Sequence, residues 1–317
     1  MYNKKMQTFT ILILSLMLPL VSYGAKYAGE PFSLGVGARP LAMGGATIAG
    51  PFDGSAGYWN PAGLNHLNGR NFIVMHAETF GSLLNHDFAG YASKKGNAKN
   101  FIQAYGFYLY YLGGGGIKIT DLNVHTERPF VVREESHADY LMAGSLSTRI
   151  RNIDLGLTGR LIYRNLPTIS GYGLTADMGA LYHPVNPIYL GLMITDALSG
   201  VIHYSNGTSE SILPTVKPAI LIQHTATDIT GRLAVSGDIK FEGIRDAAQF
   251  WQGNISLDTH LGMELSYREM LFGRAGLDIG NFTAGIGINY SRITFDLAYL
   301  HNSYFDETFR ISAGYQF

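Results

Sequence analysis

The 317-residue chain contains no cysteine. This absence excludes disulfides, thiolate metal sites, cysteine nucleophiles and a lipid-modified N-terminal cysteine. Charge is also scarce, because charged residues make up 15% of the chain, whereas soluble domains hold about 25%. The formal net charge of −1 leaves no basic excess that would indicate a nucleic-acid partner.

Long hydrophobic runs are missing as well, apart from one near the N-terminus. Lys4 and Lys5 precede an apolar run from Phe9 to Val21, and Ser22 to Gly24 provide small residues around a cleavage point. A run this short falls below the roughly 20 residues that a membrane-spanning helix needs. We therefore predict that residues 1–24 are a cleaved secretory signal peptide and that the rest of the chain has no transmembrane helix.

Glycine and aromatic residues are abundant, with 39 glycines, 20 tyrosines and 17 phenylalanines. Many segments alternate between apolar and polar residues. In 152–164 the apolar side chains stand at odd positions and the polar ones at even positions, with Ile162 as the exception, and 232–242 and 260–267 repeat this alternation. A period of two indicates strands with one apolar and one polar face.

Fourteen strands are predicted, an even number, as in bacterial outer-membrane barrels. Their ranges are 70–80, 84–94, 100–111, 138–149, 152–164, 171–183, 187–196, 214–225, 230–242, 255–267, 270–279, 282–290, 292–301 and 307–317. The long connections 112–137, 197–213 and 243–254 all follow odd-numbered strands and therefore share one side. This is typical of an all-β transmembrane antiparallel barrel with short periplasmic turns and long extracellular loops. A secreted β-sandwich or propeller is the alternative.

Residues 25–67 precede the predicted barrel of residues 68–317, and their stretch Leu34–Leu64 is glycine-rich. A barrel of this size is too wide to be filled by its own side chains. We therefore predict that residues 25–67 enter the lumen from the periplasmic side as an N-terminal hatch, or plug. Buried there, Arg39 and Asp53 would need partners. The inward polar faces of the strands offer Arg160, Arg164, Asp177, Asp238, Glu264, Arg274, Asp278, Arg292, Asp296 and Arg310.

Two consecutive motifs carry a family resemblance. GARPLAMGGATIAG, followed by DGSAGYWNPAGL, resembles the N-terminal signature of PorV/PorQ-type proteins of the FadL-like (long-chain fatty acid transporter-like) outer-membrane superfamily. GYGLTADMGALYHP, HLGMELSYREMLFGRAGL and FRISAGYQF continue the resemblance in the expected order, whereas Pro40 and Asp196 depart from it. The resemblance implies a fourteen-stranded barrel whose hatch carries Asn60, Pro61 and Ala62. The further hatch positions in these motifs are Met43, Gly44, Gly45 and Trp59.

Motifs for catalysis and metal binding are absent, since the sequence has no GxSxG, no HExxH and no close histidine pair at metal spacing. The prediction is a non-enzyme without cofactor or metal. Tyr105, Tyr108, Tyr110 and Tyr111 are interpreted as an aromatic girdle at the external membrane interface rather than a sugar-stacking platform. At the C-terminus, Tyr315 and Phe317 resemble the signal that the outer-membrane assembly machinery reads.

Two functions compete. A conduit for hydrophobic small molecules across the outer membrane is favoured by apolar residues on otherwise polar inward faces, which would line one tunnel: Ile162, Leu181, Leu221, Phe272 and Leu300. The alternative, implied by the PorV resemblance, is a docking component of a type IX-like protein secretion system that uses the long loops and the aromatic residues between Phe241 and Trp251. A mainly structural barrel is a minor alternative. The expected partners are outer-membrane lipid, the assembly machinery, and either hydrophobic molecules or secretion proteins.

Overall fold

The computed structural model describes residues 29–317 except for 80–82, 96–100, 124–125, 127 and 302–306. The predicted signal peptide therefore lies outside the described residues. Among the helices in the described ranges, none has the length and apolar character needed to cross a membrane. The architecture is instead a closed, fourteen-stranded antiparallel β-barrel, as predicted.

The barrel closes because the first strand pairs with the last, with Asn71 opposite Gln316 and Glu78 opposite Phe309. The wall strands are β1 (Arg70–Thr79), β2 (Leu84–Lys94), β3 (Ala104–Leu122), β4 (Pro129–Ile150), β5 (Ile153–Asn165), β6 (Ser170–Val185), β7 (Ile188–Thr195), β10 (Thr215–Ala226), β11 (Ile229–Lys240), β13 (Ile255–Tyr267), β14 (Leu271–Asp278), β15 (Asn281–Tyr290), β16 (Ile293–Leu300) and β17 (Thr308–Gln316). Each predicted strand corresponds to one of these.

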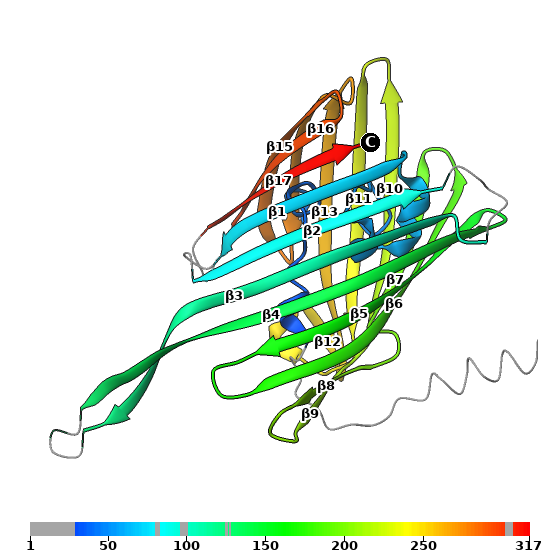
Figure 1. The fold of residues 1–317 in the computed structure, drawn as a ribbon. Coiled ribbons are helices and arrows are strands. Elements are labelled where there is room, and N and C mark those ends of the chain that lie inside the picture. The colour runs from blue at the N-terminus through cyan, green and yellow to red at the C-terminus, as the bar shows by residue number, and fades with distance from the viewer. Residues whose placement is uncertain (1–28, 80–82, 96–100, 124–125, 127, 302–306) are drawn as a thin grey trace, which may run out of the picture.

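Three further short strands lie in long connections. β8 (Gly200–Tyr204) and β9 (Ser209–Ile212) form a hairpin that pairs with β6, and β12 (Phe250–Gln252) follows η3 (Arg245–Ala247). Figure 1 shows β8, β9 and β12 at the same end of the barrel, here called the long-loop end. The opposite end, with two-residue turns such as Arg151–Asn152, is called the short-turn end.

The connection 112–137 differs from its prediction as a loop. β3 and β4 continue as a paired ribbon to Leu122 and Pro129, interrupted by register shifts near Gly114 and Ile119. This ribbon projects beyond the barrel (Figure 1). Both of its faces are largely exposed, and beyond the short alternation at 117–120 its residues lack the pattern that marks the wall strands.

The wall follows the predicted division of faces. In β5, Leu155, Leu157 and Leu161 point outward and are exposed, while Asp154 and Arg160 point inward and are buried. Apolar residues thus cover the outside of the barrel, as in a barrel surrounded by lipid, while the lumen face carries polar residues and, on β1 to β5, a buried apolar cluster.

Residues 29–67, here called the plug, lie inside this lumen (Figure 1). They form η1 (Glu30–Phe32), α2 (Ala38–Ala42), α3 (Ala56–Trp59) and η2 (Pro61–His66). Gly29 contacts Ile212 of β9 at the long-loop end, whereas the carbonyl of Gly69, just after the plug, accepts from Lys94 N at the short-turn end. The plug begins at the long-loop end and leaves at the short-turn end, and between these points it lines the cavities at both ends.

Inward-facing glycines let the plug backbone approach the wall. A Cβ at Gly156 of β5 would overlap Ala62 N, and one at Gly179 of β6 would overlap the side chain of Asn60. On the other side of the barrel, Gly262 lies against the carbonyl of Met43 in the same way. These glycines have a steric reason to be glycine, since any side chain there would displace the plug.

Candidate functional site

The lumen keeps hollows on both sides of the plug. A cavity of about 90 Å³, here called the long-loop cavity, lies between η1, α3 and the ends of β7, β10 and β11. A cavity of about 610 Å³, the short-turn cavity, opens at the other end and has a hollow of about 180 Å³ beside it. The two ends of the lumen are thus separated by the plug.

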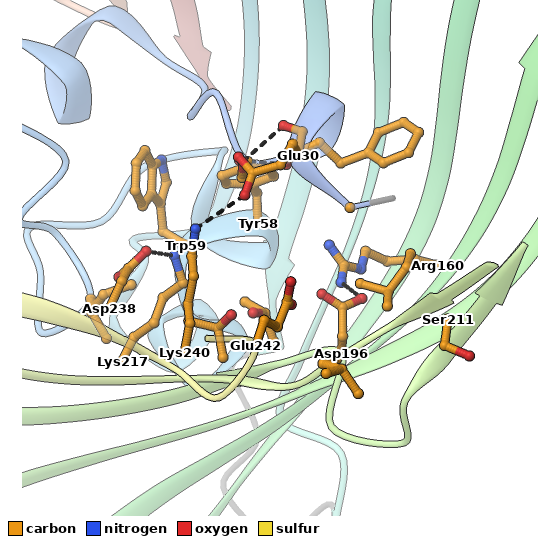
Figure 2. Close-up of a pocket in the computed structure, with 18 residues that line it drawn as sticks. Glu30, Tyr58, Trp59, Arg160, Asp196, Ser211, Lys217, Asp238, Lys240 and Glu242 are labelled. Atoms are coloured by element: carbon orange, nitrogen blue, oxygen red, sulfur yellow. Dashed lines mark hydrogen bonds and ion pairs between the residues drawn. The ribbon is translucent and has the colours of Figure 1, made fainter. Parts of the chain in front are cut away.

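The long-loop cavity has an aromatic side, which the plug supplies (Figure 2). Tyr58 and Trp59 of α3 pack edge to face, with ring centroids 5.3 Å apart. The Tyr58 hydroxyl donates to the carbonyl of Phe32 over 2.9 Å and accepts from Gly35 N over 3.1 Å. The Trp59 indole donates to the carbonyl of Val36 over 2.9 Å. Both rings are therefore fixed by folding.

The environment of Tyr58 also fixes its protonation. Burial raises the pKa of Tyr58 well above its ordinary value, so the phenol stays neutral and keeps its donor role at physiological pH.

The other side of the long-loop cavity is charged (Figure 2). Lys240 of β11 donates to Glu30 of the plug over 3.2 Å. Lys217 of β10 pairs with Asp238 of β11. Arg160 of β5 completes this side, and one of its terminal nitrogens contacts both Asp177, at 2.7 Å, and Asp196.

At the short-turn end, Arg39 holds the plug to the wall. Its Nε and one terminal nitrogen donate to the two oxygens of Glu264 over 2.9 and 2.7 Å, a forked pair. Glu264 is fully buried and also accepts from Arg232 over 2.7 Å and from Arg274 over 2.6 Å. Arg274 continues to Asp296 over 2.6 Å. Three predicted lumen residues, Glu264, Arg274 and Asp296, thus meet Arg39 of the plug and Arg232 in one network, here called the arginine–glutamate network.

The cations of this network also stack on an aromatic ring. The guanidinium carbons of Arg39 and Arg274 lie 5.6 and 4.9 Å from the ring centroid of Phe272. Burial alone would lower the pKa of Arg39, but the Glu264 carboxylate outweighs it and raises the pKa, so Arg39 stays charged.

Asp53 has a local role instead of an ion pair with Arg39. Its carboxylate accepts from the backbone N and the hydroxyl of Ser55 over 2.8 and 2.6 Å, which shapes the turn before α3.

The Asn-Pro-Ala step joins the plug to the wall. Asn60 is fully buried, and its Nδ2 donates to the carbonyls of Ile48, over 2.9 Å, and of Ala180 in β6, over 3.3 Å. Its Oδ1 accepts from Ala62 N over 3.1 Å and so caps η2, with Pro61 in the first turn. The sequence places a cap and a proline together, and this starts a helical turn that fits against Gly156.

The other predicted lumen charges find partners that the sequence did not indicate. Arg164 pairs with Asp139 over 2.7 Å. His260 contacts Asp278 over 2.9 Å and Asp238 over 3.6 Å, and its Nδ1 lies 3.0 Å from the carbonyl of Gly44 in the plug.

Two predicted lumen arginines depart from this pattern. Arg310 is buried, but its contacts are the carbonyl of Gly35 at 3.2 Å and His86 Nδ1 at 2.9 Å, rather than a carboxylate within the described residues. Arg292 is not in the lumen. It lies exposed in the turn between β15 and β16, because the strand ends before it.

The five apolar residues predicted to line one tunnel are separated. Leu181 and Leu221 face the short-turn cavity, and Phe272 lines the smaller hollow beside it. Ile162 and Leu300 instead pack in the large apolar cluster with Phe32 and Val36 of the plug. The expectation of a single continuous tunnel is therefore wrong for the described part of the chain, because the plug fills the space between these residues.

The tyrosines of β3 divide between the two faces of the wall. Tyr108 and Tyr110 point inward and are buried, and the Tyr110 hydroxyl donates to the carbonyl of Pro31 in the plug over 2.5 Å. Only Tyr105 and Tyr111 face outward, which corrects the interpretation of all four as a girdle. At the end of the chain, Tyr315 and Phe317 are exposed and pack edge to face at 4.8 Å, and their role as an assembly signal stays a prediction.

Within the described residues, no group of three or more acidic or histidine side chains is arranged to hold a metal ion. In the long-loop cavity, sequence reasoning missed Tyr58, Lys217 and Lys240. Lys217 shares the inward parity of Leu221 on the same strand, so alternation carried a signal for it.

No protein-family model and no curated protein matches the sequence. Solved structures match in fold. The CymD monoaromatic hydrocarbon channel superposes with a TM-score of 0.56 and 12% identity, covering 90% of this chain and 98% of that one. A deletion mutant of the TodX monoaromatic hydrocarbon channel gives a TM-score of 0.54 and 11% identity, covering 88% and 97%. The chain has the fold of these channels.

At such low identity the likeness shows the fold alone. A FadL homologue from Pseudomonas aeruginosa also aligns, with a TM-score of 0.47 and 12% identity over 87% of this chain and 96% of that one. The narrower resemblance to PorV/PorQ-type proteins stays a prediction.

Proposed function

We propose that the protein is an outer-membrane channel for hydrophobic small molecules, with residues 29–67 as the hatch that closes it. One observation supports this most: a closed, lipid-compatible wall encloses a plug that is attached at both ends and leaves a separate cavity on either side. The fold likeness to two hydrocarbon channels agrees with this proposal.

The orientation follows from the connections. Barrels of this kind have short turns on the periplasmic side and long loops outside. The long-loop cavity therefore faces the exterior and receives the solute, and the short-turn cavity faces the periplasm. A solute passes when the plug shifts and joins the two cavities.

The contacts of the plug suit a part that shifts as a unit. It has its own internal hydrogen bonds, such as Trp59 to Val36 and Asn60 to Ile48. Its polar contacts with the wall are numerous and spread along its length, and the forked pair of Arg39 with Glu264 is one of them. Elements that move in gating keep internal structure while their interface to the frame rearranges.

Uptake by intact cells tests the proposal. Gram-negative host cells that produce the protein in their outer membrane should take up radiolabelled toluene several-fold faster than cells with an empty vector. A matched control strain produces the same amount of a variant that lacks residues 29–67, and it should also admit hydrophilic dyes that the intact protein excludes. Equal toluene uptake with and without the protein would contradict the channel.

A specific observation favours a second function, docking in a type IX-like secretion system. The ribbon at the ends of β3 and β4 stands outside the barrel and exposes Phe130, Val131 and Val132, with 49%, 47% and 56% of each residue accessible. Apolar and aromatic residues of this kind anchor protein interfaces. Native-membrane pull-downs with the protein as bait should then recover secretion components, and a Val132→Lys variant should lose them. Recovery of none by the unmutated protein would reject this function.

A further inference from the structure

Exposed charge is distributed unequally between the two ends of the barrel. At the long-loop end, the exposed acids and cations of the described residues are nearly balanced: Glu30, Glu78, Asp121, Glu134 and Glu307 against Lys118, Arg128, Arg133 and Arg245. At the short-turn end, the exposed charged residues are mostly cations, namely Arg70, Lys94, Lys95, Arg149, Arg151, Arg268 and Arg292. Asp228 and Glu269 are the acids beside them, and each already pairs with an arginine. The short-turn end therefore presents a positive surface.

Five of these cations lie outside the mouth of the lumen. Arg149 and Arg151 line the short-turn cavity, and Arg149 pairs with Asp154 there. The other five line neither this cavity nor the hollow beside it, and they are here called the cationic rim: Arg70, Lys94, Lys95, Arg268 and Arg292. Arg268 pairs with Asp228, whereas the remaining four form no ion pair within the described ranges. Most of the charge of the cationic rim is therefore free to attract an anion.

The cationic rim follows the outer edge of the barrel. Its members stand at successive short connections: Arg268 between β13 and β14, Arg292 between β15 and β16, Arg70 at the start of β1, Lys94 at the end of β2, and Lys95 directly after it. Because β17 pairs with β1, these positions border the consecutive strands β13 to β17 and β1 to β3. The rim thus follows more than half of the perimeter.

Outward-facing aromatic rings lie next to the rim. The ammonium nitrogen of Lys95 lies 5.6 Å from the ring centroid of Tyr105, and the guanidinium carbon of Arg268 lies 5.2 Å from that of Tyr267. Both distances are in the range of cation–π contacts. Tyrosines on the outer face of a membrane barrel mark the boundary between the hydrocarbon and the lipid headgroups. The cations beside these rings therefore lie at the depth of the headgroups.

From these observations we infer that the cationic rim binds the headgroups of anionic phospholipids in the leaflet at the short-turn end. A phosphatidylglycerol headgroup carries a net negative charge, and basic clusters next to a membrane attract such lipids. A soluble acidic partner fits this rim less well, because the cations are spread along the perimeter beside lipid-facing rings. The inference concerns the wall of the barrel and goes beyond the proposed channel function.

The lipid next to the wall can be measured directly. Purified protein is reconstituted in phosphatidylcholine bilayers with a trace of spin-labelled phosphatidylglycerol, or of spin-labelled phosphatidylcholine with the same acyl chains. Electron paramagnetic resonance distinguishes the lipid held at the wall from the bulk lipid, which gives the relative association constant of the two lipids. In dilute buffer, phosphatidylglycerol should be favoured at least about threefold. The preference should disappear at about 1 M salt, where the Debye length is about 3 Å.

A matched pair of variants locates the effect. The rim variant combines Arg70→Gln, Lys94→Gln, Lys95→Gln and Arg292→Gln, which removes the four rim cations that form no ion pair within the described ranges. It should lose the preference for phosphatidylglycerol. The control variant neutralises four exposed cations at the long-loop end and should keep the preference: Lys118→Gln, Arg128→Gln, Arg133→Gln and Arg245→Gln. Heat-dependent mobility on gels checks that both variants are folded.

The decisive measurement needs no variant. Equal association of the two lipids with the unmutated protein in dilute buffer would overturn the inference and leave a soluble acidic partner as the occupant of the rim. A preference that persists in high salt or in the folded rim variant would also overturn it, as would its loss in the control variant. Because the readout is lipid association, these outcomes are distinguishable from a failure of toluene uptake, which would contradict the channel alone.

Discussion

The two ends of the lumen differ in what the plug brings to them. At the long-loop end the plug contributes the rings of Tyr58 and Trp59 to a cavity of about 90 Å³ whose charges are paired. At the short-turn end it contributes Arg39 to a network of charges beside a cavity of about 610 Å³. Under the proposed function the first end receives the solute, whereas at the second end the Arg39–Glu264 pair holds the plug to the wall. Variants at the two ends should therefore have different effects.

The largest effect is expected from Glu264→Gln. Glu264 is the common partner of Arg39, Arg232 and Arg274, so its neutralisation removes the carboxylate partner of Arg39 and leaves Arg232 and Arg274 with Glu269 and Asp296 alone; breaking a buried ion pair in this way costs about 3–5 kcal/mol. The temperature at which the barrel unfolds, read from heat-dependent mobility on gels, should fall markedly. Glu269→Gln is the matched control, because Glu269 is half exposed and pairs only with Arg232 among these arginines. Equal unfolding temperatures for the two variants would show that the network does not stabilise the barrel.

Arg39→Ala should act on the plug more than on the wall. Glu264 keeps Arg232 and Arg274, so the barrel stays folded while the plug loses its forked anchor. We expect a several-fold rise in small-ion conductance across planar bilayers. Arg151→Ala is the control, since Arg151 is exposed in a turn beside the same cavity. Unchanged conductance in Arg39→Ala would mean that packing alone keeps the plug in place.

Gly156→Ala tests the fit of the plug against the wall. The added methyl group would overlap the backbone between Pro61 and Ala62, and such overpacking costs about 1–3 kcal/mol. Hydrogen exchange in 60–67 should become faster. Gly159 lies on the same strand with open space around it, so Gly159→Ala should leave the exchange unchanged. If both variants exchange alike, the steric reading of the inward glycines is wrong.

The smallest effect is expected from Asp53→Asn. Asparagine can still accept from Ser55, so only the charge-assisted part of the two hydrogen bonds is lost, about 0.5 kcal/mol. Exchange at 53–59 should rise slightly, while conductance stays at the wild-type value. A conductance as high as in Arg39→Ala would show that Asp53 also holds the plug.

The wall could be predicted from the sequence because lipid and lumen impose opposite polarity on successive residues. β5, β11 and β13 carry this alternation clearly. The ribbon of β3 and β4 could not be predicted in the same way, because both of its faces are largely exposed and its polarity alternates only over 117–120. The girdle interpretation is wrong for Tyr108 and Tyr110 because aromatic residues occur both in membrane girdles and in buried cores. The alternation of inward and outward positions along the strand is the only sequence signal that distinguishes the two.

The sequence predicts which residues face the lumen better than it predicts which of them contact one another. Inward parity placed Glu264, Arg274 and Asp296 in the lumen, but only the strand register sets Glu264 opposite both Arg232 and Arg274. The long-loop cavity could not be predicted, because it depends on the position of α3 in the lumen. The periodicity of the sequence does not determine that position. Arg292 lies in the turn before β16 rather than in the strand, because the sequence pattern does not determine the residue at which a strand begins.

The central claim, that movement of residues 29–67 opens the channel, can be tested by locking the plug. Ala42 of α2 and Ala298 of β16 are fully buried in one cluster, and the chain has no other cysteine that could compete for pairing. In an Ala42→Cys, Ala298→Cys variant, toluene uptake by intact cells should fall to the empty-vector rate when the disulfide forms and return on reduction. Undiminished uptake with the disulfide fully formed would contradict the account.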